Sequence, residues 1–157
     1  MTPTTTLDTS SPYAYRPVET ALLLLDWYSL FVEGAAGPNA AAARDVTIQF
    51  RKWAKSYGIT VIHCLIDANG TLGPVCKDKE RYQGFLQVMK TTTDPEPAEL
   101  RDELEVYFQR APAHVSALNS PGLVEHLKAQ GIKSLVLTGL STSGCVLRTA
   151  ITATDAE

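Results

Sequence analysis

Residues 134 to 150 read Ser-Leu-Val-Leu-Thr-Gly-Leu-Ser-Thr-Ser-Gly-Cys-Val-Leu-Arg-Thr-Ala. The pattern predicts a buried strand, a turn bracketed by Gly139 and Gly144, and a helix with Cys145 in its first turn. A helix N-terminus places partial positive charge and free backbone N–H groups beside the sulfur, and this favours the thiolate. The same N–H groups can stabilise an oxyanion when the sulfur attacks a carbonyl. The stretch therefore predicts a site of covalent catalysis at Cys145.

Strands and helices alternate on the N-terminal side of this stretch. Apolar runs predict further strands at 20–26, 59–65 and 105–109. Helices are predicted at 39–56, from Ser120 to Gly131, and from 143 to about 156. This alternation predicts a three-layer α-β-α fold with a Rossmann-like, mostly parallel sheet.

Several finer expectations follow from local patterns. Residues 66–95 are expected to form a long loop with one helical turn near 82–89, and 96–104 a short helix. Ser120 is expected to cap the helix that ends at Gly131. The residues expected to face inward are Val46, Phe50, Trp53 and Ala54 in one helix, and Leu123, Val124 and Leu127 in another.

The composition is that of a single globular domain. The 157 residues divide into a flexible tail, 1–19, rich in Thr, Ser and Pro, and a domain over 20–157. A net charge of −3 gives no basic surface for nucleic acid, and no apolar run approaches the ~20 residues of a membrane span. Three cysteines without paired spacing favour a reducing, cytoplasmic location over a disulfide scaffold.

Three reactive side chains follow the predicted strands. Asp26 ends the first strand, Arg110 follows the third, and Cys145 follows the fourth. In parallel α/β sheets, ligands bind beyond the carboxyl ends of the strands, where the strand order switches. We therefore expect these side chains to meet at one site.

At these residues the chain resembles the isochorismatase-like cysteine hydrolase superfamily, which includes nicotinamidases, carbamoylsarcosine-type amidohydrolases and ureido hydrolases. The resemblance spans residues 20 to 156. The matching pieces are Ala21-Leu-Leu-Leu-Leu-Asp26 with Phe31, Val61-Ile-His63, Val115-Ser-Ala-Leu118, Leu137-Thr-Gly-Leu-Ser-Thr-Ser-Gly-Cys-Val146 and Thr149-Ala150.

The resemblance implies roles for these residues. Cys145 would attack a carbonyl and form a thioester, while Asp26 carries the proton to and from the thiol. A cis peptide at Leu140–Ser141 would aim the backbone N–H groups of Ser141 and Cys145 at the oxyanion. The implied substrate is a small amide, lactam or ureido compound. The expected pocket residues are Phe31, Tyr28 and His114.

Two departures from the family concern the site. The usual lysine after the third strand is Arg110 here, and an arginine keeps its charge but cannot carry protons. Tyr28 stands where the family usually has a glutamine. The nicotinamidase metal pattern is also absent, since Asp67 is not followed by a histidine at the required spacing. We therefore expect no metal or other cofactor.

A third departure is the end at Glu157, because members usually continue into at least one further strand and helix. The strand 134–138 would then have an open side, an edge that proteins normally cover or pair. Dimerisation of a shortened chain and a fragment of a longer one both fit the sequence. We keep a homodimer or higher homo-oligomer as the expected partner, beside a small-molecule substrate.

Other interpretations fit the same residues. Cys145 could be a packed core residue and Arg110 a surface charge, and His63 is expected to be a hydrogen-bonded core histidine. Two other functions also fit. One is an isomerase, cyclase or lyase acting on a specialised metabolite, because isochorismatases themselves cleave a vinyl ether in this fold. The other is a non-catalytic relative that serves as a binding or oligomerisation partner.

Overall fold

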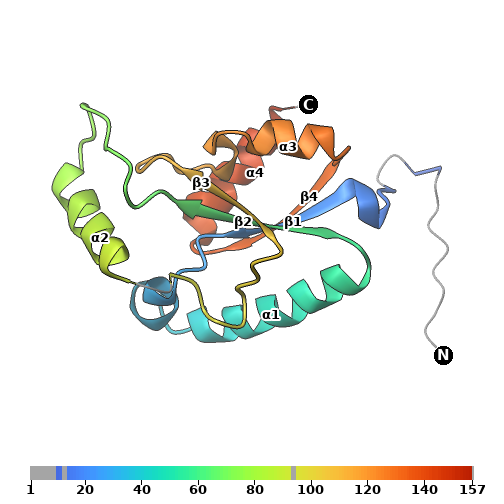
Figure 1. Ribbon diagram of the computed structural model, residues 1–157, viewed down its shortest axis with the longest axis horizontal. Helices are drawn as coiled ribbons and strands as arrows, with labels where there is room; N and C mark the ends of the chain where they lie inside the picture. Colours follow the sequence, from blue (N-terminus) through green and yellow to red (C-terminus); the bar gives the residue numbers. More distant parts are fainter. Residues whose placement is uncertain (1–9, 12–13, 93–94, 157) are drawn as a thin grey trace.

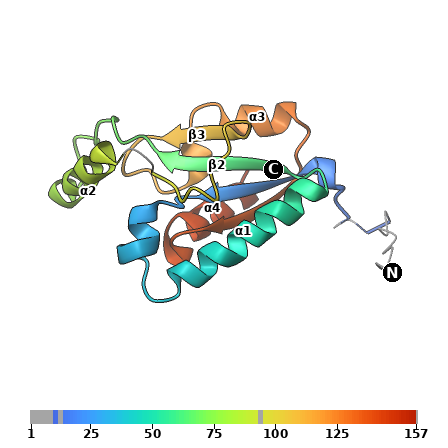
Figure 2. The same ribbon diagram turned by 60° about the horizontal axis from the view of Figure 1, so that its bottom comes forward.

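The computed structural model describes residues 10–11, 14–92 and 95–156. Within them, an all-parallel sheet has the strand order β3-β2-β1-β4. Its strands are β1 (Thr20–Leu25), β2 (Thr60–Ile66), β3 (Val106–Arg110) and β4 (Ser134–Gly139). The helices are α1 (Ala40–Ser56), α2 (Lys79–Thr91), α3 (Leu123–Ala129) and α4 (Leu147–Thr154). α1 covers one face of the sheet, and α3 and α4 cover the other (Figures 1 and 2). The predicted three-layer α/β fold is confirmed.

The central strand β1 explains the apolar run that predicted it. Its residues from Ala21 to Leu25 are fully buried, because both faces of the strand are covered. Leu23 packs in the cluster with Leu123 of α3, whereas Leu24 packs in the cluster with Ala54 of α1. The sheet core therefore lies directly beneath the carboxyl end of β1, which carries Asp26.

Strand β4 lies at the sheet edge formed by the described residues, with β1 as its neighbour. Its side chains are half-buried. The two strands run in register from Thr20 opposite Ser134 to Leu25 opposite Gly139. A Cβ built on Gly139 would lie 2.5 Å from the carbonyl oxygen of Leu25 and 2.6 Å from its Cβ. Gly139 therefore permits the close approach of β4 to β1 directly before the turn to Cys145.

Gly139→Ala is expected to destabilise the fold by about 1–3 kcal/mol, because backbone must move to admit the methyl group. Urea unfolding measures this change. Gly84→Ala is the matched control, since a Cβ at Gly84 in α2 meets nothing within 4 Å. The control is expected to be stabilising by roughly 0.5–1 kcal/mol through helix propensity. Equal stability of wild type and Gly139→Ala would contradict the close-packing argument.

The buried face of α1 differs from the prediction. Val46 and Trp53 are 68% and 45% exposed, Phe50 is half-buried, and only Ala54 of the expected set is fully inward. Arg51 takes an inward position instead, where it bonds to carboxylates after α2. A buried ion-pair network has replaced part of the apolar stripe. The half-buried ring of Phe50 stacks on the exposed ring of Trp53.

Three other local expectations are wrong. The single helical turn expected near 82–89 is the thirteen-residue helix α2. Residues 96–104 form turns rather than a helix, and their carboxylates bind side chains of α1 and β2. Gly122, with φ of 81°, is the N-cap of α3 in place of Ser120. Leu123 and Leu127 are buried as expected, and Val124 is half-buried.

Only part of the expected tail can be compared, because residues 1–9 and 12–13 lie outside the described residues. A short helical turn, Pro17–Glu19, precedes β1, and Glu19 accepts a 2.7 Å bond from Lys133 Nζ. No helix in the described part of the chain is long and apolar enough to cross a membrane.

Candidate active site

The expected side chains lie together at the carboxyl ends of the strands, which is the end of the sheet nearest α2 (Figure 1). Asp26 follows β1, Arg110 ends β3, and both side chains are buried. They form a bidentate ion pair, with Arg110 Nη1 2.9 Å from Asp26 Oδ1 and Nη2 2.5 Å from Oδ2. Such a pair is geometrically specific, because the planar guanidinium matches both oxygens of an ionised carboxylate.

Further contacts fix the guanidinium of Arg110. Its Nε donates to the carbonyl oxygen of His114 at 2.7 Å, and Nη1 also donates to that of Leu65 at 3.2 Å. Burial opposes the charge, but hydrogen bonding and attraction to Asp26 outweigh it and raise the pKa of Arg110. Arg110 is therefore a permanent cation that orients Asp26 and exchanges no proton with it.

Cys145 lies beside this pair, in an irregular helical turn over Thr142–Val146. Gly144, with φ of −95° and ψ of −112°, interrupts the turn before α4 begins at Leu147. The sulfur is buried and donates to the carbonyl oxygen of Leu140 at 3.1 Å. Burial and then the negative charge of Asp26 raise the pKa of Cys145 far above its ordinary value. Burial and Asp26 therefore oppose the thiolate that the helix start was expected to favour.

Alkylation of Cys145 by iodoacetamide is expected to be slower than that of a free model thiol, because only the thiolate reacts. The raised pKa means that the rate should climb with pH beyond pH 9 without a plateau, since an unperturbed cysteine titrates near ~8.5. Peptide mass mapping separates Cys145 from Cys76, a half-buried free thiol that serves as the internal control. A plateau for Cys145 at or below pH 8 would show that its thiolate is stabilised.

The turn before Cys145 has the backbone that the resemblance implied. The Leu140–Ser141 peptide bond is cis. The carbonyl oxygen of Ser141 accepts from the amides of Gly144 at 3.1 Å and Val146 at 3.4 Å, which closes the turn. Ser141 and Cys145 both line the cavity described next. That the backbone N–H groups of Ser141 and Cys145 form an oxyanion site remains a prediction.

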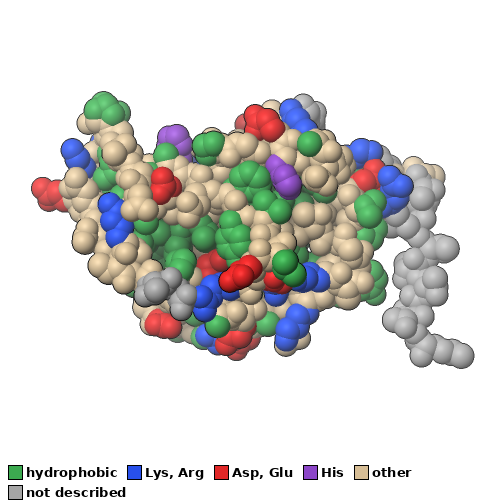
Figure 3. All heavy atoms as spheres, viewed as in Figure 1, with side chains coloured by type: hydrophobic (Ala, Val, Ile, Leu, Met, Phe, Trp, Pro, Cys, Tyr) green, Lys and Arg blue, Asp and Glu red, His purple; other side chains and the backbone are tan. Residues whose placement is uncertain are grey.

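A cavity of about 720 Å³ connects these groups. Asp26, Arg110 and Cys145 line it, together with Phe31 and His114, two of the three residues proposed from the sequence as pocket residues. The space-filling view shows hydrophobic side chains gathered in a hollow beside α2 (Figure 3). Tyr28 does not line this cavity. Its buried hydroxyl accepts from the amide of Ile66 at 2.7 Å and donates to the carbonyl oxygen of that residue, and its ring supports Phe31 edge-on.

We did not predict from the sequence that side chains of α2 line this cavity. Phe85 stacks on Phe31 with ring centroids 5.0 Å apart and an angle of 9° between the planes. Tyr82 lines the same wall, whereas Leu86 and Met89 are buried. These four residues have the 3-1-3 spacing of one helical face, which was the available signal for a longer helix. The aromatic wall indicates an apolar, flat-sided binding space.

The sequence model of the isochorismatase domain matches residues 20–157, and the chain therefore belongs to the isochorismatase family. No curated protein matches it significantly. The structure is similar to a cysteine hydrolase from Pseudomonas syringae pv. phaseolicola 1448A, with a TM-score of 0.71 and 19% identity over 90% of this chain and 68% of that chain. It is also similar to a pyrazinamidase of Pyrococcus horikoshii in complex with zinc, with a TM-score of 0.66 and 17% identity over 88% and 79%. A nicotinamidase from Staphylococcus aureus gives a TM-score of 0.59 and 18% identity over 88% and 76%.

The zinc in the pyrazinamidase structure raises the question of a metal in this chain. In the described part of the chain, no group of three or more His, Cys, Asp or Glu side chains is placed to hold a metal ion. His114 lines the cavity, but Asp26, a carboxylate that also lines it, is already bound by Arg110 through both oxygens. The described residues therefore do not fit a zinc ion.

Proposed function

We propose that this protein is a cysteine hydrolase that cleaves the C–N bond of a small amide, lactam or ureido compound through a thioester intermediate. The observation that carries the proposal is the placement of a buried cysteine and a buried, arginine-held carboxylate in one cavity, which Asp26, Arg110 and Cys145 all line. The names of the similar structures, a cysteine hydrolase, a nicotinamidase and a pyrazinamidase, support hydrolysis of this kind.

The geometry suggests how the protons move. The resting thiol of Cys145 is neutral, and Asp26 accepts its proton as the sulfur attacks the carbonyl carbon. The backbone N–H groups of Ser141 and Cys145 stabilise the oxyanion. Asp26 then protonates the leaving nitrogen as the C–N bond breaks. Water next attacks the thioester, gives its proton to Asp26, and the proton returns to the departing sulfur. Arg110 holds Asp26 in place throughout and takes no proton.

A panel of primary amides, lactams and ureido compounds tests this reaction, with the product mass as the readout. Hydrolysis adds the mass of one water: an amide or ureido compound then releases ammonia, an amine or a carbamate, whereas a lactam opens to a single amino acid. Quenched wild-type protein should also carry the acyl group on the peptide that contains Cys145. Turnover without such an adduct, under conditions in which deacylation is slow, would contradict the thioester.

The second candidate is an isomerase, cyclase or lyase that uses the same cavity. Arg110 is the observation that favours it, because a bidentate arginine holds Asp26 but offers no second proton carrier for the leaving group. An isomerisation leaves the mass of the substrate unchanged, and an elimination divides it between two products without added water. The same mass measurement therefore separates the two candidates.

A further inference from the structure

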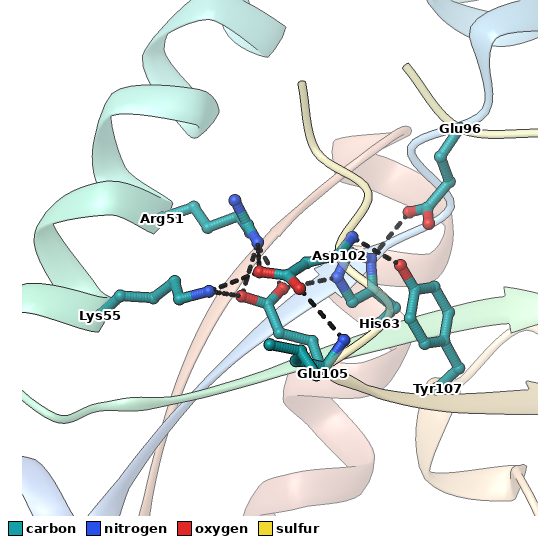
Figure 4. Close-up of polar contacts among 8 residues, drawn as sticks. Arg51, Lys55, His63, Glu96, Asp102, Glu105 and Tyr107 are labelled. Carbon is teal, nitrogen blue, oxygen red and sulfur yellow. Dashed lines mark hydrogen bonds and ion pairs between the residues drawn. The ribbon is translucent and has the colours of Figure 1, made fainter. Parts of the chain in front are cut away.

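A buried cluster of charged side chains lies on the α1 side of the sheet (Figure 4). His63 of β2 is at its centre and is fully buried, which confirms the prediction of a hydrogen-bonded core histidine. Its Nδ1 is 3.1 Å from Oε1 of Glu96, and its Nε2 is 2.8 Å from Oε2 of Glu105. An ionised carboxylate only accepts hydrogen bonds, so two such contacts need both ring nitrogens protonated. The placement of His63 between two carboxylates therefore favours its imidazolium form.

The other groups around His63 balance its charge. Arg51 and Lys55 of α1 bind Glu105 at 2.6 Å and 2.9 Å, and both also bind Asp102. Three cations and three carboxylates thus form a neutral cluster when His63 is protonated. The Tyr107 ring of β3 stacks on the imidazole with centroids 4.2 Å apart, which favours the cationic form. Burial lowers the pKa of His63, but the two carboxylates outweigh it and raise that pKa.

This cluster fixes the 95–105 segment, which contains no helix or strand. Leu100 anchors the middle of the segment in the apolar cluster under α1, and Glu96 anchors its first turn to His63. The residue before Glu96, Pro95, accepts a 2.8 Å hydrogen bond from the amide of Ser29. Ser29 begins a helical turn that continues into Phe31, and Asp26 lies three residues before it.

We infer that Glu96 and His63 are positioning residues for the candidate active site. Their contact holds Pro95 where it binds Ser29, and that bond fixes the 26–31 segment, which carries Asp26 and Phe31. Neither side chain lines the cavity in which Cys145 lies. The inference rests on the proposed function only in that it takes this cavity as the substrate pocket.

Glu96→Gln tests the link, because the amide keeps the size of the side chain but removes the charge that holds His63. Hydrogen exchange of the Ser29 amide is the readout, with its protection factor expected to fall at least tenfold. The amide of Leu23, in the buried strand β1, reports global stability and is expected to keep its protection. Glu103→Gln is the matched control, since Glu103 is an exposed carboxylate of the same segment. Should Glu96→Gln not fold, Glu96→Asp takes its place, with a smaller loss of Ser29 protection expected.

A folded variant with unchanged Ser29 protection would overturn the inference, as would an equal loss at Ser29 and Leu23. In the wild type, the protection factor of Ser29 should also fall as the pH rises through the pKa of His63, because the neutral ring leaves one carboxylate without a donor. With a confirmed substrate, Glu96→Gln should lower kcat, because Asp26 is held less firmly, and raise KM, because Phe31 is held less firmly, whereas Glu103→Gln should change neither. The exchange measurement needs no turnover, so failure of the proposed reaction leaves this test intact.

Discussion

Cys145→Ala is expected to abolish turnover of any substrate that the wild-type protein hydrolyses, with a loss of at least about 10³-fold in kcat, because no other group can form the thioester. The fold should survive. Cys145 is a small buried residue, and its thiol donates a hydrogen bond to the carbonyl oxygen of Leu140. The change in unfolding free energy is expected to stay within about 1 kcal/mol. Steady-state kinetics and urea unfolding measure the two effects separately.

Two controls make the result specific to this thiol. Cys76→Ala removes a half-buried loop thiol that does not line the cavity, and it should leave kcat unchanged. Cys145→Ser keeps a hydroxyl nucleophile of lower reactivity and should retain only a trace of the activity. Full activity of the alanine variant would exclude covalent catalysis at Cys145, and the non-catalytic alternative would gain weight if the wild type also failed on the whole panel.

The ends of the strands could be predicted from the sequence, because each is determined by the pattern of a few neighbouring residues. The apolar run from Ala21 to Leu25, which ends in a carboxylate, predicts a strand covered on both faces, so Asp26 was expected at a strand end. The glycine-bracketed turn similarly placed Cys145. The pairing of Asp26 with Arg110 followed from topology, since parallel strands β1, β2 and β3 end at the same side of the sheet.

Properties that depend on distant residues could not be predicted in the same way. Arg51 faces inward because Asp102 and Glu105 bind it across more than fifty positions of sequence, and no periodicity within α1 contains that information. The raised pKa of Cys145 could not be predicted for a related reason. The helix start is visible in sequence, whereas the burial that outweighs it is not. Tyr28 stands at a pocket position in sequence, but its hydroxyl is satisfied by Ile66 of β2.

The buried Asp26–Arg110 pair gives the second large effect. Arg110→Met is expected to destabilise the fold by about 3–5 kcal/mol, because it leaves the carboxylate of Asp26 buried without its partner. Asp26→Asn should cost a comparable amount by leaving the guanidinium unpaired. The double variant removes both charges, and it should recover most of the lost stability, since neutral groups of similar size can replace a buried ion pair at little cost. Urea unfolding of the four proteins gives the coupling energy directly.

The activities of these four proteins should not follow their stabilities. The double variant remains without the proton carrier, so its kcat should stay at least about 10²-fold below wild type even where the fold is restored. Arg44→Met is the control, because the Arg44–Asp45 pair is on the surface and worth at most about 1 kcal/mol. If the double variant were as unstable as the sum of the single variants, the two residues would not act as a pair. If it were as active as the wild type, Asp26 would not carry the proton. A stable but inactive double variant would show that the ion pair holds the carboxylate in place and that the carboxylate performs the chemistry.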